Sequence, residues 1–167
     1  HPSIVTVRRQ LTYSDADLLA ESDADITQLY SIARMFRHKR LDEGAIHISL
    51  PEVSVGFEKN GTPKIIRSER EAPSRMLISE LMILANSVMA EFLNKNRVPA
   101  VFRSQPDPRE RLYQRDNGSL FQNWMQRKSL SRFVLSTRGG RHSALGVEAY
   151  VTATSPIRKY YDLITQR

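Results

Sequence analysis

The spacing of apolar residues predicts one strand and two helices in the first forty residues. Residues 3–11 are expected to form a strand, because Ile4, Val5 and Val7 stand among polar neighbours. Ser14 and Asp17 have the spacing of a helix-start signal, so a short helix is expected to follow through Ala20. A second helix should begin near Asp25, because apolar residues then recur at steps of three and four. They are Ile26, Leu29, Tyr30, Ala33 and Phe36.

The next segment alternates and points to a hairpin. Residues 45–48 are expected to be extended, and residues 53–57 carry apolar side chains at every second position. They lead to Asn60-Gly61, a pair typical of two-residue hairpin turns. Residues 64–67 are therefore predicted to form the return strand.

The longest helix is predicted over residues 75–94. Ser74 is a candidate for its N-cap, since a serine oxygen accepts a free backbone N–H at a helix start. The apolar face is wide enough for a central, mostly buried helix. It contains Leu77, Leu81, Leu84, Val88 and Phe92, with Met82, Ala85 and Met89 beside them.

Beyond Pro99 the elements are shorter and their pattern is mixed. Residues 119–137 fit a helix around Trp124 or a strand around Val134, and the pattern leaves both open. The other expected elements are a strand at 100–102, a helix at 109–115, a turn at 138–141, an extended stretch at 142–151 and a closing helix from Ser155 or Pro156. Together these elements predict an α+β (mixed) fold, with helices packed on a partly antiparallel sheet.

Charge is distributed unevenly along the chain. Residues 1–96 hold 12 Lys and Arg against 13 Asp and Glu, whereas residues 97–167 hold 13 against 5, and eleven of those 13 are arginines. Arginine suits bidentate contact with phosphate, so this excess favours a polyanionic partner, although solvated charge that only aids solubility has the same composition. The chain has no cysteine, which fits a cytoplasmic location. No apolar run approaches the roughly 18 residues of a membrane span, so no membrane partner is expected.

Clustered carboxylates and a closing turn are the candidate sites. Asp15 and Asp17, and again Asp23 and Asp25, have the residue type that binds magnesium, but acids at helix starts also complement the helix dipole. We favour that capping interpretation, and the four histidines lack a metal-ligand spacing.

The closing turn contains a candidate anion site. Ser155 as N-cap and Pro156 as first helical residue would leave free N–H groups at a positive helix end, and such an end binds anions. Arg158 and Lys159 in the first turn would oppose the dipole unless an anion offsets the cost. The alternative is a plain Ser-Pro helix start with solvated charges.

Five segments resemble the catalytic (RNB) domain of the ribonuclease II/R family, in that family's order. Residues 150–163, YVTATSPIRKYYDL, resemble its Y-x-x-x-T-S-P-I-R-[RK]-Y-x-D-L signature. Residues 142–145 resemble its H-F-G-L, and residues 79–86 its E-E-x-M-x-x-A-N helix. Residues 99–103 resemble its P-A-L-Y-R, and residues 11–16 its L-[ST]-Y-[ED]-x-[AV] segment. The resemblance spans residues 1–167.

This resemblance implies a 3′→5′ exoribonuclease that hydrolyses single-stranded RNA to nucleoside 5′-monophosphates. Such enzymes use two magnesium ions, held by aspartates upstream of the tyrosine segment, so Mg²⁺ is expected in the intact parent domain and not on this chain. The chain is accordingly expected to be the C-terminal portion of the domain, truncated at both ends and inactive alone.

Site residues follow from the matched positions. Tyr13 matches the active-site tyrosine near the terminal nucleotide, and Arg158 matches the arginine at the cleaved phosphate. Ser155, Lys159 and Tyr160 are expected to bind RNA with Arg158.

Two departures from the family pattern leave another reading open. Ser79 replaces an acid usually tied to activity, and Ile48 stands where some members stack an aromatic residue on a base. A non-catalytic RNA-binding relative is therefore the alternative, and a basic interaction module unrelated to RNA is a weaker one.

Overall fold

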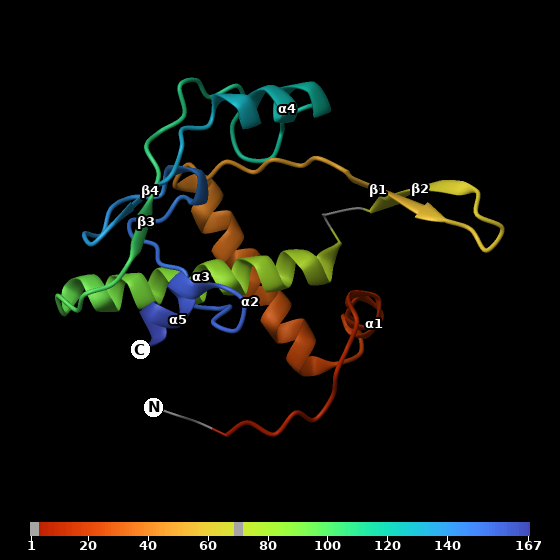
Figure 1. Cartoon of the computed structure of the whole chain (residues 1–167), viewed down its shortest axis with the longest axis horizontal. Helices are drawn as coiled ribbons and strands as arrows, with labels where there is room; N and C mark the ends of the chain where they lie inside the picture. Colours follow the sequence, from red (N-terminus) through yellow and green to blue (C-terminus); the bar gives the residue numbers. More distant parts are fainter. Residues whose placement is uncertain (1–3, 69–71) are drawn as a thin grey trace.

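The computed structural model describes residues 4–68 and 72–167 and contains both helices and strands (Figure 1). The mixed fold class is thus confirmed. The helices are α1 (Tyr13–Leu19), α2 (Ala24–Asp42), α3 (Pro73–Lys95), α4 (Leu120–Ser129) and α5 (Tyr160–Gln166), with a short 3-10 turn at Ser143–Leu145. The strands are β1 (Glu52–Phe57), β2 (Pro63–Ser68), β3 (Phe102–Ser104) and β4 (Val134–Ser136).

Helices α2 and α3 cross at the centre of the molecule, and the other elements surround them (Figure 1). Asp23 caps α2 by accepting N–H bonds from Asp25 and Ile26 at 3.1 and 3.3 Å. At the start of α3, Pro73 takes the first turn and Ala72 is the N-cap, so the prediction that Ser74 caps this helix is wrong by two residues. Proline fits there because the first helical N–H groups have no partner within the helix.

The apolar core lies where α3 packs on β3. It joins Ala90 and Leu93 of α3 to Phe102 and to the segment that contains Ala149 and Val151. The backbone N–H of Arg103 donates to the Tyr150 carbonyl at 2.8 Å, which adds this segment to the edge of β3. A helix packed on an antiparallel pair is the arrangement that the apolar pattern predicts.

Helix α3 is also long and apolar enough to cross a membrane, judged by length and composition alone. This corrects the expectation that no segment reaches that threshold. Core helices of water-soluble domains pass the same test, and here α3 is the helix against which α2, α1 and β3 lie.

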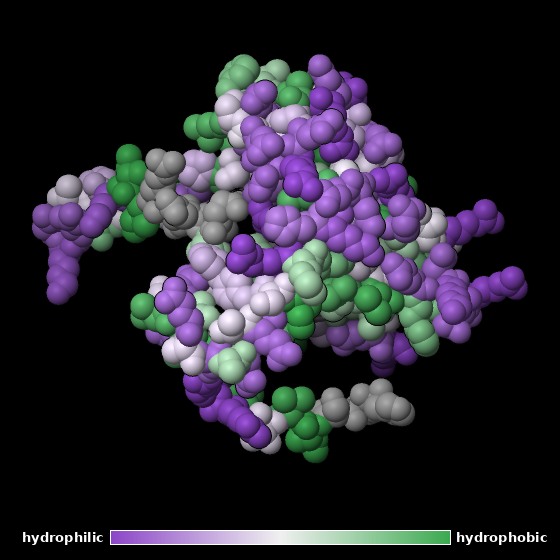
Figure 2. All heavy atoms as spheres, turned by 180° about the vertical axis from the view of Figure 1, so that it is seen from behind, coloured by the Kyte–Doolittle hydropathy of each residue, from purple (hydrophilic) through white to green (hydrophobic). Residues whose placement is uncertain are grey.

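The strands form two separate antiparallel pairs instead of one sheet. β1 pairs with β2 through the turn at Asn60-Gly61, with Val55 opposite Ile65. β3 pairs with β4, with Phe102 opposite Ser136. The β1–β2 hairpin projects from the body, and its apolar side chains are exposed (Figure 1). On the rear face apolar side chains interrupt a mostly polar surface, including on this hairpin (Figure 2).

One predicted strand is absent among the described residues, and the predicted extended stretch at 142–151 is extended only in part. Residues 4–11 are exposed and unpaired, so the prediction of a strand over 3–11 is wrong for its described part, and residue 3 lies outside the described residues. A strand requires a neighbour for its backbone groups, and no described strand lies beside this segment. The stretch 142–151 forms isolated bridges and the short turn at Ser143–Leu145, which Gly146 ends in the left-handed region (φ 63°).

The predicted helix at 109–115 is absent as well. The Leu112 N–H donates to the side chain of Gln126 at 2.8 Å, and the Arg109 N–H donates to the Ser129 carbonyl at 3.0 Å. These N–H groups are bound to α4 and its end, so they are not available for a helical ladder. Both open possibilities for 119–137 are realised in succession, as α4 and then β4.

Candidate functional site

The closing segment forms a turn before its helix begins. The N–H groups of Arg158 and Lys159 donate to the Ser155 carbonyl at 3.2 and 3.0 Å, and α5 starts only at Tyr160. The prediction that Ser155 or Pro156 starts the helix is therefore wrong. Proline favours the second position of such a turn, and the extended backbone of Lys159 (φ −130°) separates the turn from the helix. An anion site in this segment would thus depend on the turn and not on a helix end.

The buried carboxylate of Asp162 holds this turn in place. Its side chain is 1% exposed, and its Oδ2 accepts the Ser155 N–H at 2.9 Å. Asn86 of α3 holds the backbone two residues before Ser155, because its Oδ1 accepts the Ala153 N–H at 3.0 Å. The side-chain amide of Gln166 donates to the Ala153 carbonyl. Three side chains from two helices therefore fix the backbone of the turn.

The predicted RNA-binding residues of the turn lie together at the surface. Arg158, Lys159 and Tyr160 are exposed, and Ser155 is half-buried. Arg158 Nη2 lies 3.4 Å from Ser155 Oγ, and no carboxylate pairs with Arg158 among residues 4–68 and 72–167. This guanidinium is open to an external anion.

Tyr13 lies at the start of α1, against the start of α3. Its carbonyl accepts the Ser74 hydroxyl at 3.1 Å, and the guanidinium carbon of Arg75 lies 4.7 Å from its ring centroid. The ring borders a pocket of about 570 Å³. The pocket is lined mainly by apolar side chains and by three that carry a hydroxyl, from Leu11, Thr12, Tyr13, Ala16, Ile26, Ser74, Leu77 and Ile78. A planar group can enter there beside the tyrosine ring.

One helix carries both parts of the predicted site. Tyr13 is attached to α3 at Ser74, and the closing turn is attached to it through Asn86. These positions are twelve residues apart, which is about 18 Å along a helix axis. No hydrogen bond or ring contact joins Tyr13 to the turn itself within the described part of the chain. Four of the five predicted residues, Ser155, Arg158, Lys159 and Tyr160, lie together, and α3 sets their position relative to the fifth, Tyr13.

The acidic clusters act as helix caps. Thr12 and Asp15 form a capping box around the start of α1, two residues earlier than the predicted Ser14 and Asp17. The Thr12 bonds lower the pKa of the Asp15 carboxyl below its ordinary value. Asp17 instead accepts the Ser74 N–H at 2.8 Å and caps α3 from outside. Within residues 4–68 and 72–167, no group of three or more His, Asp or Glu side chains is placed to hold a metal.

Glu80 is used inside the fold. Its two carboxylate oxygens accept Arg40 Nη2 and Nε at 2.5 and 2.9 Å, and both side chains are almost fully buried. Arg40 Nη1 also donates to the Leu145 carbonyl at 2.6 Å. The neighbouring Ser79 is exposed on another side of α3, because adjacent helical residues point about 100° apart. Glu80 therefore anchors α2 to α3 and cannot replace the acid that position 79 lacks.

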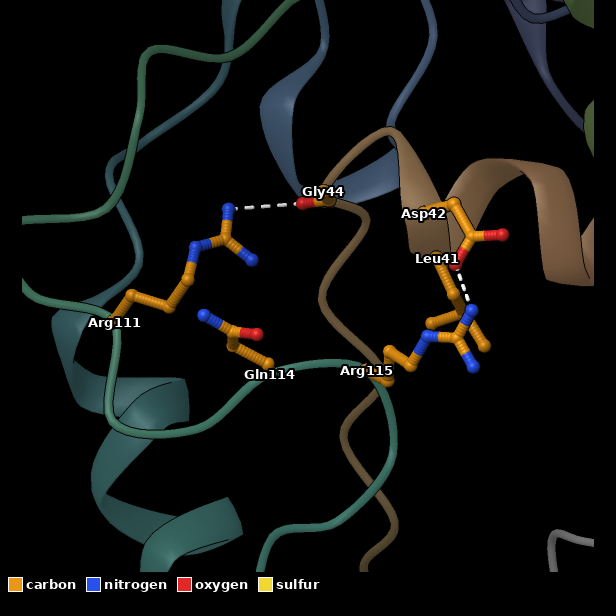
Figure 3. A pocket seen from close by; sticks show the side chains of 6 residues that line it. All are labelled: Leu41, Asp42, Gly44, Arg111, Gln114 and Arg115. Atoms are coloured by element: carbon orange, nitrogen blue, oxygen red, sulfur yellow. Dashed lines mark hydrogen bonds and ion pairs between the residues drawn. The ribbon is translucent and has the colours of Figure 1, made fainter.

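Several arginines of the basic C-terminal part have structural partners. Figure 3 shows a pocket of about 380 Å³ beside the end of α2, lined by Leu41, Asp42, Gly44, Arg111, Gln114 and Arg115. Arg111 Nη2 donates to the Gly44 carbonyl at 2.9 Å, and Arg115 forms an ion pair with Asp42 (Figure 3). Arg141 binds the neighbouring Glu43 carbonyl at 3.0 Å. Part of the positive excess thus stabilises the C-terminal end of α2, where free carbonyls attract cations.

A buried histidine lies near the core. His142 is 4% exposed, and its ring meets Tyr150 edge-on with centroids 5.6 Å apart. Burial, with the positive charge of Arg103, lowers the pKa of His142 to about 4. Burial also raises the pKa of the Tyr150 hydroxyl, which accepts a hydrogen bond from Asn86 at 3.1 Å. Both side chains are uncharged at neutral pH and act as packing elements in the protein interior.

Asp162, Asn86 and Gln166 were not predicted as site residues. Asp162 and Asn86 belong to the signature segments quoted above, but spacing alone does not tell which backbone group a side chain will bind. The signal for Asp162 was an acid placed seven residues after Ser155, with an apolar residue after it.

Comparison with known proteins supports the resemblance found in the sequence. The family model described as the RNB domain matches residues 1–167. An uncharacterized ribonuclease of Synechocystis sp., sll1290, is 33% identical over 172 residues, which cover 98% of this chain and 26% of that protein. The chain spans about a quarter of the length of this curated relative.

Solved structures share the fold. The Dss1 exoribonuclease of Candida glabrata (an active-site mutant) superposes with a TM-score of 0.75 at 24% identity, covering 93% of this chain and 23% of that chain. Mycoplasma genitalium RNase R, in complex with ribose-methylated single-stranded RNA, gives a TM-score of 0.71 at 19% identity, covering 93% and 31%. Yeast Ssd1, described as a pseudonuclease, gives a TM-score of 0.65 at 17% identity, covering 94% of this chain and 24% of that chain. The same fold thus occurs in nucleases and in a protein described as lacking that activity.

Proposed function

Because this chain belongs to the RNB domain family, we propose that it forms part of a 3′→5′ exoribonuclease that releases nucleoside 5′-monophosphates from single-stranded RNA. The chain spans about a quarter of its curated relative, so this activity is assigned to the complete protein and not to these residues alone. In this proposal the chain supplies the contacts to the RNA and positions the phosphate that is cleaved.

The exposed guanidinium of Arg158, which has no carboxylate partner among the described residues, carries the proposal. It stands on a turn whose backbone is held by Asp162, and its Nη2 donates to Ser155 Oγ at 3.4 Å, so its attachment to the chain is set before the RNA arrives. A preorganised guanidinium binds a phosphate in the ground state and stabilises the added charge of the transition state. Lys159 and Ser155 would bind the adjacent backbone, and Tyr160 offers an exposed ring to a base.

Tyr13 and its pocket are proposed to receive the terminal nucleotide. The pocket is large enough for a nucleobase and is mainly apolar, as a planar base requires. The Arg75 guanidinium lies over the tyrosine ring, 4.7 Å from its centroid, and helps to hold the ring in place. The residues beside the ring would exclude water from the reacting end of the RNA.

The magnesium ions of this proposal would be held outside this chain. The described residues offer no cluster of ligands, and Asp15, Asp17 and Asp23 are committed to helix starts. When bound, magnesium would activate the attacking water and stabilise the leaving oxygen. The residues of this chain are assigned only binding and positioning.

The test is an exoribonuclease assay on the complete protein with a single-stranded RNA and magnesium. Arg158→Ala is expected to lower kcat about a hundredfold, by analogy with the loss of one transition-state donor. Lys59→Ala, an exposed lysine in the distant hairpin turn, is the matched control and should leave kcat unchanged. Unchanged turnover in the Arg158 variant would overturn the assignment.

The second candidate is an RNA-binding relative that does not cleave. It is favoured by Ser79, which replaces an acid tied to activity in the family, and by the commitment of Glu80 to Arg40. RNA binding that depends on Arg158, without nucleotide release in magnesium, would support this candidate over the enzyme.

A further inference from the structure

Helix α4 has its polar and apolar faces reversed with respect to the core. Its buried residues are the amides Asn123 and Gln126, at 3% and 0% exposure. Its outward positions carry Leu120, Phe121 and Trp124. A helix that is held by apolar packing would show the opposite pattern.

The two buried amides explain how the helix is held. Asn123 Oδ1 accepts the Ser49 N–H at 2.9 Å and the Tyr113 hydroxyl at 2.7 Å, and its Nδ2 donates to the Gly118 carbonyl at 2.7 Å. Gln126 accepts the Leu112 N–H at 2.8 Å and donates to the Glu110 carbonyl at 2.9 Å. Hydrogen bonds therefore fix α4 to the body, so its aromatic side chains are not needed for attachment.

The outward face of α4 is a stripe of aromatic and basic side chains. Phe121 is 67% exposed and Trp124 is 45% exposed, with ring centroids 6.1 Å apart and a 34° tilt. Lys128 Nζ lies 3.6 Å from the Trp124 ring centroid, and Arg127 is exposed beside it. We call Phe121, Trp124, Arg127 and Lys128 the α4 stripe. Helix α4, which carries the stripe, lies at the edge of the molecule, away from the crossing of α2 and α3 (Figure 1).

The sequence around the α4 stripe contains no acidic residue. Residues 117–147 contain five Lys or Arg and no Asp or Glu. A surface that paired two exposed aromatic rings with a protein partner would need no such one-sided charge. Exposed rings beside cations that have no carboxylate partner among the described residues are the combination that binds single-stranded nucleic acid, since bases stack on an exposed ring face and cations neutralise phosphates.

We propose that the α4 stripe is a second contact surface for single-stranded RNA, separate from the closing turn, in which Phe121 and Trp124 stack on bases and Arg127 and Lys128 contact the adjoining phosphates. This inference rests on the proposed function only in taking RNA as the ligand. The stripe would hold a segment of the strand that is not being cleaved, so it would add to affinity and not to the chemical step.

Binding of a fluorescein-labelled oligouridylate to the full chain, followed by anisotropy at several salt concentrations, tests the inference. Phe121→Ala with Trp124→Ala is expected to weaken binding at least about fivefold, because one stacked base contributes that much or more. In that double variant the slope of log affinity against log salt concentration should stay unchanged. Arg127→Ala should instead reduce the slope by the equivalent of about one phosphate contact. Leu120→Ala, an exposed apolar change on the same helix, is the matched control and should bind like the parent.

Trp124 provides a direct readout, because it is the only tryptophan of the chain. Its emission should be quenched when the oligouridylate binds, and the Arg158→Ala variant should still show quenching at saturating RNA. If the Phe121→Ala/Trp124→Ala variant binds RNA as tightly as the parent while Arg158→Ala binds more weakly, the role of the α4 stripe is overturned and the proposed function stays intact. A parent chain that binds no RNA contradicts both. Emission that changes with protein concentration and not with RNA overturns the stripe in favour of self-association.

Discussion

The buried carboxylate of Asp162 accepts the backbone N–H of Ser155 at 2.9 Å, and this bond fixes the turn that presents Arg158. Its other oxygen, Oδ1, is buried without a hydrogen-bond partner among the described residues. The bond to Ser155 therefore carries the contribution of this side chain to the fold.

Removal of that carboxylate should loosen the turn. We expect Asp162→Ala to lower the free energy of unfolding by about 1–3 kcal/mol, because the N–H of the half-buried Ser155 loses its acceptor. Asp162→Asn keeps an oxygen that can accept this bond and should cost less. Urea denaturation measures both, with Glu148→Ala at an exposed acid as control. Equal stability of the alanine variant and the parent would contradict this role.

Loss of the buried ion pair should be far more damaging. Glu80→Ala leaves the Arg40 guanidinium buried without its partner, which is expected to cost about 3–5 kcal/mol in the free energy of unfolding. Ser79→Ala changes an exposed side chain on the same helix and should stay within about 0.5 kcal/mol of the parent. A small loss in the Glu80 variant, measured by the same denaturation, would mean that the pair does not join α2 to α3.

His142 should make the protein sensitive to acid. The pKa of His142 is about 4 in the folded chain and near 6.5 in the unfolded chain, so the unfolded chain binds the proton more tightly. Stability should therefore be unaffected above pH 6.5 and fall as the pH is lowered from 6.5 to 4, by roughly 2–3 kcal/mol. His142→Gln should flatten that part of the profile of unfolding free energy against pH. An unchanged slope in the variant would assign the effect to other groups.

Two glycines with positive φ should respond differently to alanine. Gly146 has φ 63°, and an added Cβ would lie 2.7 Å from the Arg40 carbonyl oxygen. Gly61 has φ 82°, but nothing lies within 4 Å of its added Cβ. Gly61→Ala should cost about 1 kcal/mol through backbone strain alone, and Gly146→Ala clearly more, because the backbone it meets must move. Similar thermal shifts for the two variants would contradict the close approach.

Local signals predicted the elements that depend on local interactions. The hairpin at Asn60-Gly61 and the helices over 24–42 and 73–95 follow from turn chemistry and apolar periodicity, which each segment contains in itself. The resemblance of five short segments likewise identified the family.

The errors occur where a backbone group finds a distant partner. Gln126 takes the Leu112 N–H and prevents a helix there, and residues 4–11 lack a described neighbouring strand. Residues Ser155 and Pro156 form a turn because the carboxylate of Asp162, seven residues after Ser155, accepts the Ser155 N–H. The reversed faces of α4 were hidden for the same reason, since a sequence does not state that amides will be buried and aromatic rings left outside.

Glu80 and Ser79 point in different directions on α3, and this has a consequence for how position 79 can vary. Glu80 ties two helices together, whereas position 79, which the family resemblance links to activity, points in a different direction, so one can change while the other stays. A carboxylate in place of Ser79 should therefore change the free energy of unfolding little. Variants that differ at position 79 alone should then melt alike, whatever their activity.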